Sequence, residues 1–359
     1  MSHPARWWHR QDDGKLLCTL CPRFCRLGDG QAGFCYIRKN EGGAMVSLGY
    51  GRTTGFAVDP IEKKPLNHFL PGTSILSFGT AGCNLGCKFC QNWDISKARL
   101  DDKQSAPVTP AQVVDLAVAQ GCPSIAMTYN DPVIWAEFAV DIAREARARG
   151  VRSVLVSAGY VTEEARGELF ADIDAANIDL KAFTDDFYHQ VTFAHLQPVL
   201  ETLRWLKQET KVWLEITNLM IPGLNDSEDE TKRLCEWIGR ELGDRVPLHF
   251  TAFHPDFKMR DRPPTPPATL QRARQLAHDV GLKYVYTGNI RDRQGATTFC
   301  PGCGAAVIAR DGYATNPAGL VAGRGRGRCA ACDTAIDGVF DLPLAASPGR
   351  RRGLGLVYD

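Results

Sequence analysis

Three closely spaced cysteines, Cys83, Cys87 and Cys90, restrict the fold of this chain more than any other feature. They follow an apolar, strand-like run that ends in a glycine-rich turn, SILSFGTAG. A [4Fe–4S] cluster has four irons and is usually held by four thiolates, so three thiolates on one short loop leave one iron open to a ligand. The triad could instead belong to a zinc site or to a closed electron-transfer cluster. A zinc knuckle does not normally follow an apolar strand and open an α/β domain, and we therefore favour the open cluster.

The composition is that of an ordinary globular protein without a marked charge. Hydrophobic residues make up 44% of the 359 residues, which is enough for a sizeable core. The 42 basic and 41 acidic residues nearly cancel, so no global charge attracts the chain to nucleic acid or to a membrane. No apolar run approaches the roughly 20 residues that span a bilayer, and the N-terminus lacks the apolar core of a signal peptide. We expect a cytoplasmic protein.

All but two of the 13 cysteines fall in three groups, which in a chain without a secretion signal indicates metal sites rather than disulfides. The first group has the spacing C-x2-C-x3-C-x9-C and consists of Cys18, Cys21, Cys25 and Cys35. This spacing differs from that of a bacterial ferredoxin, and we favour structural zinc over an auxiliary iron–sulfur cluster there. The last group forms the two C-x2-C knuckles of a zinc ribbon and consists of Cys300, Cys303, Cys329 and Cys332.

Composition and periodicity divide the chain into three regions. Residues 1–73 are rich in cysteine and glycine, residues 74–292 alternate strands with amphipathic helices, and residues 297–359 form a short tail with the zinc ribbon. Near-continuous apolar strands that alternate with helices predict a parallel sheet covered by helices. About six βα units fit a partial (β/α)6 barrel, although periodicity alone is also compatible with a doubly wound open sheet.

Capping residues delimit several of the expected helices. Asp131 precedes Pro132, the N-cap and first-position combination that opens a helix, and Gly150 has the place of a C-terminal glycine. Ser227 and Glu230 form an S-x-x-E capping box for a helix that runs to about residue 241.

Polar residues also follow the ends of the predicted strands, where barrels of this kind place their sites. Tyr129 and Asn130 follow the second strand, Ser157 ends the third, and His254 ends a later one. Each could contact a ligand or could simply cap, terminate or stabilise its element.

Asp179 and Lys181 are the strongest candidates among these polar residues. They lie two residues apart in the strand-like run NIDLK, so both side chains should project into the interior of the barrel. A carboxylate and an ammonium group are costly there unless they are paired or used. We favour a binding role over a mutual salt bridge alone.

The motifs of nearly the whole chain resemble those of one branch of the radical S-adenosylmethionine (radical SAM) superfamily. This branch is the AmmeMemoRadiSam system radical SAM enzyme, which is related to pyruvate formate-lyase activating enzyme. The resemblance rests on LCTLCPRFCRL, DPIEKKPLNHFLPG, GTAGCNLGCKFCQNWDIS, TYNDP, IDLKAF and the terminal ribbon. It implies a TIM-like partial (β/α)6 barrel in which an open [4Fe–4S] cluster binds SAM and cleaves it to a 5′-deoxyadenosyl radical.

The resemblance also implies which residues contact SAM. Asp179 and Lys181 match the Asp-x-Lys strand of glycyl-radical enzyme activases, and His254 matches a histidine near SAM in the same enzymes. Tyr129 and Asn130 stand where many relatives carry Gly-Gly-Glu, so their contacts are expected to differ. Ser157 is expected to bond the SAM ribose or to terminate its strand.

These features predict a radical SAM enzyme whose substrate the sequence does not identify; a protein or an RNA is one candidate class. Two alternatives are a glycyl-radical enzyme activase and a non-catalytic zinc or iron–sulfur scaffold. The expected partners are an electron donor of the flavodoxin or ferredoxin type and, by resemblance, AMMECR1-domain and Memo-like proteins. Arg324, Arg326 and Arg328 between the knuckles leave nucleic-acid binding open, although a solvated tail explains them as well.

Overall fold

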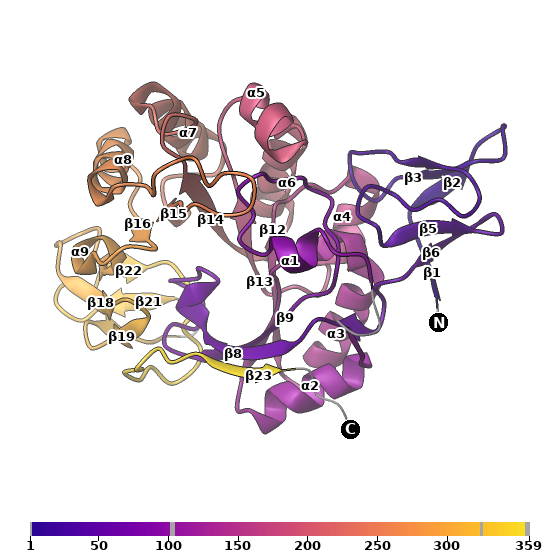
Figure 1. Cartoon of the computed structure of the whole chain (residues 1–359). Helices are drawn as coiled ribbons and strands as arrows, with labels where there is room; N and C mark the ends of the chain where they lie inside the picture. The colour runs from indigo at the N-terminus through magenta and orange to yellow at the C-terminus, as the bar shows by residue number, and fades with distance from the viewer. Residues whose placement is uncertain (1, 101–104, 324–325, 356–359) are drawn as a thin grey trace.

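The computed structural model describes residues 2–100, 105–323 and 326–355, and it centres on one large sheet (Figure 1). Nine strands form this sheet in the order β16-β15-β14-β13-β12-β11-β9-β8-β23. Seven of them are parallel and neighbour one another in chain order: β9 (Ser74–Phe78), β11 (Ser124–Met127), β12 (Arg152–Ser157), β13 (Ala175–Asp179), β14 (Trp213–Met220), β15 (Leu248–Ala252) and β16 (Val285–Gly288). The other two are antiparallel: β8 (Phe56–Pro60) and β23 (Arg352–Gly355).

Helices connect the parallel strands and cover one face of the sheet (Figure 1). The main ones are α2 (Pro110–Ala119), α3 (Ala136–Ala148), α4 (Glu163–Phe170), α6 (Leu196–Glu209), α7 (Glu228–Glu241) and α8 (Pro267–Val280). Short helical turns make up the rest: η1 (Ile61–Lys63), α1 (Trp93–Ser96), η2 (Pro132–Trp135), α5 (Asp185–Phe187), η3 (Tyr188–Thr192) and α9 (Arg293–Ala296).

The predicted caps are found at three helix ends. The Asp131 side chain accepts a hydrogen bond from the Val133 amide at the start of η2, and Ser227 accepts one from the Glu230 amide at the start of α7. The Glu230 carboxylate accepts from the Phe183 amide at 2.6 Å, so only the Ser227 half of the predicted capping box is found. Gly150 has φ = +71° and follows Arg149, the C-cap of α3, in a conformation that glycine adopts at little cost. Local sequence therefore fixes these ends.

The central sheet is open within the described residues. Its edge strands are β16 and β23, and no strand pairing joins them. The structure thus confirms an α/β fold with a parallel sheet, but it shows no closed barrel.

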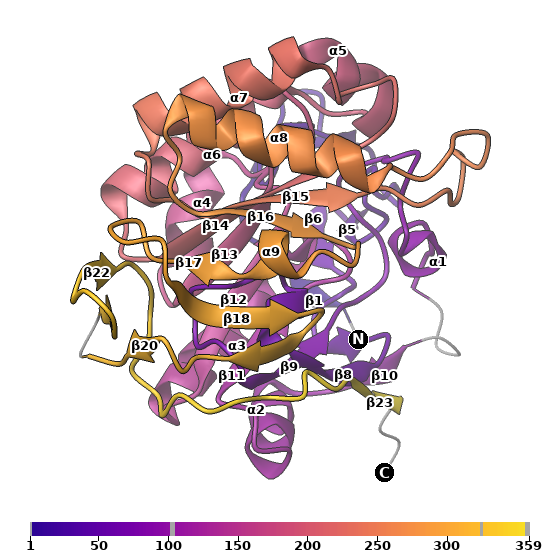
Figure 2. The same ribbon diagram turned by 90° about the vertical axis from the view of Figure 1, so that its left-hand side faces the viewer.

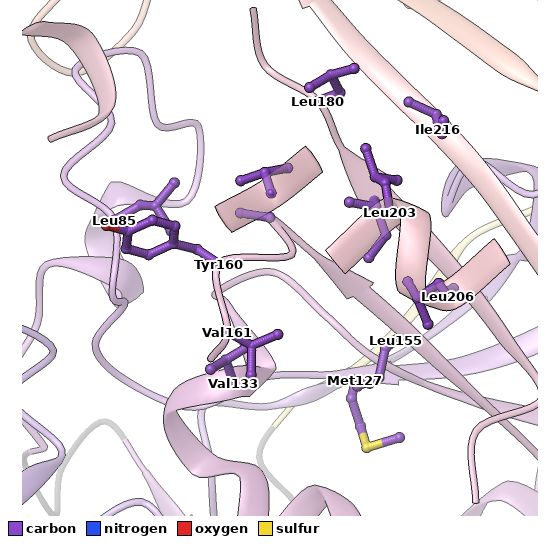
Figure 3. Packing of buried hydrophobic residues seen from close by; sticks show 14 of the residues in the cluster. Leu85, Met127, Val133, Leu155, Tyr160, Val161, Leu180, Leu203, Leu206 and Ile216 are labelled. Carbon is purple, nitrogen blue, oxygen red and sulfur yellow. The ribbon is translucent and has the colours of Figure 1, made fainter. Parts of the chain in front are cut away.

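The core on the helix side of the sheet contains alternate residues of the strands together with the apolar faces of the helices. Figure 3 shows part of it, including Met127 of β11, Leu155 of β12 and Leu203 of α6. Leu85, from the loop that carries Cys83, Cys87 and Cys90, belongs to the same cluster of buried residues. The cysteine loop is therefore fastened to the main core.

A second, smaller core lies on the other face of the sheet. Ala126, Val154 and Ala175 of three adjacent strands pack there against Phe69 and Leu70, and Val339 of the tail packs against the same cluster. These residues cover the part of this face near the strand beginnings. Polar residues continue along it toward the strand ends.

The N-terminal region forms two small antiparallel sheets beside α3 and α4 (Figure 1). Their strands are β1 (His3–Pro4), β6 (Ala44–Ser47) and β5 (Arg38–Glu41) in one, and β2 (Trp8–Arg10), β3 (Leu16–Cys18) and β4 (Arg26–Leu27) in the other. A two-stranded ribbon pairs β7 (Arg52–Thr53) with β10 (Ala106–Pro107).

The tail forms two three-stranded sheets that lie beside β16 and β8 (Figure 2). They consist of β17 (Thr298–Phe299), β18 (Ala306–Asp311), β19 (Ala314–Asn316), β20 (Leu320–Val321), β21 (Gly327–Cys329) and β22 (Ala335–Ile336). Strands β8 and β23 come from the predicted N-terminal and tail regions, yet both join the central sheet. The division at residues 73, 292 and 297 remains a prediction.

Candidate functional site

A cavity of about 550 Å³ opens at the carboxyl ends of the parallel strands. Cys83, Cys87 and Cys90 line it, and so do Asp179 and Lys181 from the end of β13. The sequence separates these groups by about 90 residues, and the parallel sheet brings them together because its strands end at one edge.

The backbone of the cysteine loop is held by hydrogen bonds to two neighbouring segments. The Gly86 amide donates to the Thr192 carbonyl at 2.8 Å and the Lys88 amide to the Val191 carbonyl at 3.0 Å, both in the π-helical turn η3. The Gly82 amide donates to the Ile95 carbonyl at 3.0 Å. These bonds fix the loop between α1 and η3, which presents its thiols to the cavity.

Two glycines allow the loop to approach its neighbours closely. Gly82 has φ = +85°, and a Cβ there would lie 2.1 Å from the carbonyl oxygen of Cys35. A Cβ at Gly86 would lie 2.7 Å from the ring of Phe193. Any larger side chain would displace the loop.

The three loop thiols suit a cluster better than a single ion. Cys87 is buried and Cys83 and Cys90 are partly exposed, so the set faces the cavity. Among the described residues, these three sulfurs do not all lie within 4.8 Å of one another, so at least one pair is farther apart. Thiolates that each bind a different iron need such wide spacing, whereas thiolates on one zinc lie closer together.

Asp179 and Lys181 form an ion pair at the cavity wall. Lys181 Nζ lies 2.9 Å from Asp179 Oδ2, and the lysine side chain is only 13% exposed. Burial lowers the pKa of Lys181, but the carboxylate of Asp179 and the sulfur of Cys87 raise it more, so the pKa lies above its usual range. The pair therefore offers a fixed positive and a fixed negative group beside the cysteine loop.

Tyr129 and Asn130 also line the cavity, but their side chains already bind other parts of the chain. The Tyr129 hydroxyl donates to Asp59 Oδ2 at 2.9 Å. Asn130 Nδ2 donates to the Gly82 carbonyl at 2.8 Å, and Asn130 Oδ1 accepts from the Thr80 amide at 3.2 Å. Asn130 thus braces the loop that leads to Cys83.

Ser157 lines the cavity as well, and its hydroxyl is bound to Asp131. One carboxylate oxygen of Asp131 accepts from Ser157 Oγ at 2.9 Å and the other accepts from the Ala158 amide at 3.0 Å. Burial raises the pKa of Asp131, although these hydrogen bonds act against the increase. Asp131 therefore joins the ends of β11 and β12 in addition to capping η2.

His254 does not lie with these residues. It is exposed and is not among the residues that line the cavity, because β15 ends at Ala252 and the chain then turns outward. Of the two aromatic residues near Cys90, Phe89 lines the cavity, whereas Trp93 stacks on Phe257 at 5.6 Å between ring centres.

Sequence reasoning missed a cationic group that lines the end of the cavity nearest β8. Asp59, which is fully buried, binds Lys63 at 2.9 Å, Lys64 at 2.7 Å and Arg351 at 3.2 Å. Lys63, Lys64, Arg351 and the hydroxyl-bearing Tyr313 all line the cavity. The two lysines of the run EKKP could have been predicted as part of a cationic group. No local pattern, however, indicates that the tail places Arg351 beside them.

The four cysteines of the tail form a compact group. Their ligand atoms all lie within 4.8 Å of one another, with Sγ–Sγ distances of 3.6 Å for Cys300–Cys332 and 3.7 Å for Cys303–Cys329. Four sulfurs about 2.3 Å from one zinc would be about 3.8 Å apart, so this group could hold a metal ion of that kind. Of the arginines between the knuckles, Arg328 pairs with Asp333, and Arg324 lies outside the described residues.

Comparisons with known proteins agree with the geometry of the cavity. The sequence model of the radical SAM superfamily matches residues 78–235, which include the cysteine loop and β13. The chain is 42% identical to "Uncharacterized protein MJ0808" of Methanocaldococcus jannaschii over 93% of this chain and 98% of that protein. It is 22% identical to pyruvate formate-lyase-activating enzyme of Clostridium pasteurianum over 50% of this chain and 80% of that protein.

Residues 78–235 therefore belong to the radical SAM superfamily. Among solved structures, a radical SAM methyltransferase from Sphaerobacter thermophilus matches 66% of this chain and 71% of that chain, with 18% identity and a TM-score of 0.48. Superfamily membership implies a [4Fe–4S] cluster and SAM, and the three loop thiols fit the first of these by their chemistry and spacing. No helix in the described part of the chain is both long and apolar enough to cross a membrane.

Proposed function

We propose that this protein is a radical SAM enzyme whose cluster is held by Cys83, Cys87 and Cys90. The observation that carries the proposal is that these thiols and the Asp179–Lys181 ion pair line one cavity at the strand ends. When bound, the cluster and SAM together supply a 5′-deoxyadenosyl radical that abstracts hydrogen from a substrate. The proposal treats the open parallel sheet as a partial (β/α)6 barrel with the cavity at its mouth.

The residues around the cavity have distinct tasks in this proposal. SAM carries an amino group and a carboxylate. The Asp179 carboxylate is complementary in charge to the amino group, and the Lys181 ammonium is complementary to the carboxylate. Asn130 and Ser157 act mainly by positioning, because their side chains hold the Gly82 carbonyl and Asp131 respectively. His254 is not part of the proposal, since it lies outside the cavity.

The substrate would occupy the part of the cavity lined by Lys63, Lys64 and Arg351. These three cations surround one carboxylate, Asp59, and the local excess of positive charge favours an anionic or phosphate-bearing group. Phosphate of RNA and acidic side chains of a protein both meet this requirement.

A glycyl-radical enzyme activase is the second candidate function. Its support is the homology to pyruvate formate-lyase-activating enzyme and to 4-hydroxyphenylacetate decarboxylase activating enzyme of Clostridium scatologenes, the latter at 25% identity over 32% of this chain. The two additional cysteine groups, and Tyr129 and Asn130 in place of the Gly-Gly-Glu segment, count against an activase. We therefore rank this function second.

The proposal includes further components that follow from the resemblance. The tail cysteines hold zinc, a low-potential donor of the flavodoxin or ferredoxin type supplies electrons, and AMMECR1-domain and Memo-like proteins are partners. A cytoplasmic location remains a prediction.

Electron paramagnetic resonance (EPR) tests whether SAM binds at the proposed site. The protein is reconstituted anaerobically with iron and sulfide, reduced, and measured with and without SAM. The spectrum of the reduced cluster should change on addition of SAM, because the open iron gains ligands. A spectrum that stays the same at saturating SAM would contradict the proposal.

A further inference from the structure

The four N-terminal cysteines surround a small enclosed cavity of their own, separate from the larger one. Cys18, Cys21, Cys25 and Cys35 all line it, and Arg38 and Asn84 are among the other residues of its wall. Three of the four thiols are buried, and none of the four is in a disulfide.

The spacing of these sulfurs differs from that of the tail cysteines. In the part of the chain that the structure describes, the tail sulfurs form a group within 4.8 Å, whereas those of residues 18–35 do not. Four sulfurs that lie about 2.3 Å from one zinc leave no room at the centre even for a water molecule. Wider spacing of the sulfurs is instead what a four-iron core needs, because each thiolate binds a different iron.

A buried arginine supplies positive charge beside the cavity. Arg38 is 2% exposed and forms an ion pair with Glu137 at 2.6 Å, yet its Nε has no hydrogen-bond partner within the described residues. A buried donor without a partner is costly. An anionic cluster between the four thiolates would place negative charge next to this group.

We infer that Cys18, Cys21, Cys25 and Cys35 hold an auxiliary [4Fe–4S] cluster, not the structural zinc that their spacing in the sequence suggests. All four irons would have protein ligands, so this cluster would not bind SAM. It would lie next to the cysteine loop that carries Cys83. The Cys35 carbonyl contacts Gly82, and Asn84, which follows Cys83, lines the N-terminal cavity. The inference is independent of the proposed function, because it concerns other ligands.

The test uses the full chain with the triple substitution Cys83→Ala, Cys87→Ala and Cys90→Ala, reconstituted anaerobically with iron and sulfide. About four iron and four sulfide per chain should remain, as expected for one closed cluster. On reduction, the variant should give an EPR signal that does not change when SAM is added. Iron near zero, with or without zinc in its place, would overturn the inference.

A second pair of variants guards against misfolding of the first. Cys25→Ser in the otherwise unchanged chain should lose about half of the iron and keep the SAM-sensitive EPR signal. Cys122→Ser, at a buried cysteine outside all three groups, should keep all of the iron. Equal iron contents in the two single variants would also overturn the inference, whereas failure of SAM cleavage alone would affect only the proposed function.

Discussion

At the scale of single residues, the site is built from groups that are either fixed by partners or exposed to the cavity. Asn130, Asp131 and Ser157 make hydrogen bonds to the chain at 2.8–3.2 Å and hold the strand ends together. Asp179 and Lys181 form an ion pair with each other and line the cavity beside the cysteine loop. This difference separates positioning residues from those that we expect to contact SAM.

Replacement of Asp179 tests that distinction. Asp179→Asn removes one charge-assisted interaction, which is typically worth about 1.5–3 kcal/mol, so SAM affinity should fall roughly 10- to 100-fold. The iron content should not change, because Asp179 is not a thiolate ligand. Asp229→Asn, in an exposed ion pair with Arg233 on α7, is the matched control and should bind SAM normally. Unchanged SAM affinity of Asp179→Asn by equilibrium binding would exclude this role.

Glu62 should make stability depend on pH. Burial raises its pKa to about 7, although Arg310 acts against this, and one carboxylate oxygen has no hydrogen-bond partner within the described chain. Because the folded pKa exceeds the unfolded value, the stability that the protonated group contributes is lost as pH rises from about 4.5 through 7, by about 3 kcal/mol in total.

Glu62→Gln removes this titration. Its melting temperature relative to the unmodified protein should therefore be higher at pH 8 than at pH 5. Glu209→Gln, at an exposed glutamate, provides the comparison. Its melting temperature should differ from that of the unmodified protein by the same amount at pH 5 and at pH 8. If Glu62→Gln and Glu209→Gln behave alike in thermal unfolding across this range, Glu62 is not buried as described.

At the scale of elements, local sequence predicts the helix ends and the direction of the strand side chains. Asp131, Gly150 and Ser227 are found at the predicted ends because capping depends on neighbouring residues only. The two-residue period correctly puts Asp179 and Lys181 on one side. His254 was harder to place, because the direction of the chain after β15 depends on contacts with distant loops.

The tail sheets should depend on their metal. Their buried hydrophobic cluster contains only a few residues, including two of the cysteines, so it cannot supply much folding free energy. The double substitution Cys303→Ala and Cys332→Ala should reduce zinc from about one per chain to near zero and lower the melting temperature. Cys235→Ala, at a buried cysteine of α7, should keep the zinc. Zinc analysis that gives equal contents for the two would contradict the assignment.

At the scale of the whole molecule, the tail and the segment after β8 pack on the face of the sheet opposite the helices. Arg310 of β18 donates to the Asn67 carbonyl at 2.7 Å and to Thr298 Oγ1 at 2.8 Å, and β23 pairs with β8. The tail is thus docked on the same sheet that carries the cavity. The sequence could not predict this, because contacts across more than 200 residues leave no local pattern.

Replacement of Arg310 tests how firmly the tail is docked. Arg310 is 3% exposed, and Arg310→Leu removes its donor from the buried Asn67 carbonyl and its bond to Thr298, so the free energy of unfolding should fall by about 3 kcal/mol. Arg293→Leu breaks only an exposed ion pair with Asp311 and should change it by less than about 1 kcal/mol. Denaturant unfolding measures both values, and equal losses would mean that the tail is not docked through Arg310.

The formation of 5′-deoxyadenosine from SAM tests the central claim most directly. The anaerobically reconstituted protein, with dithionite and SAM, should release 5′-deoxyadenosine and methionine, and the Cys83→Ala, Cys87→Ala, Cys90→Ala variant should release neither. The protein with the single substitution Cys122→Ala should release as much 5′-deoxyadenosine as the unmodified protein. Release by the triple variant, or no release by unmodified protein whose cluster is intact, would contradict the account.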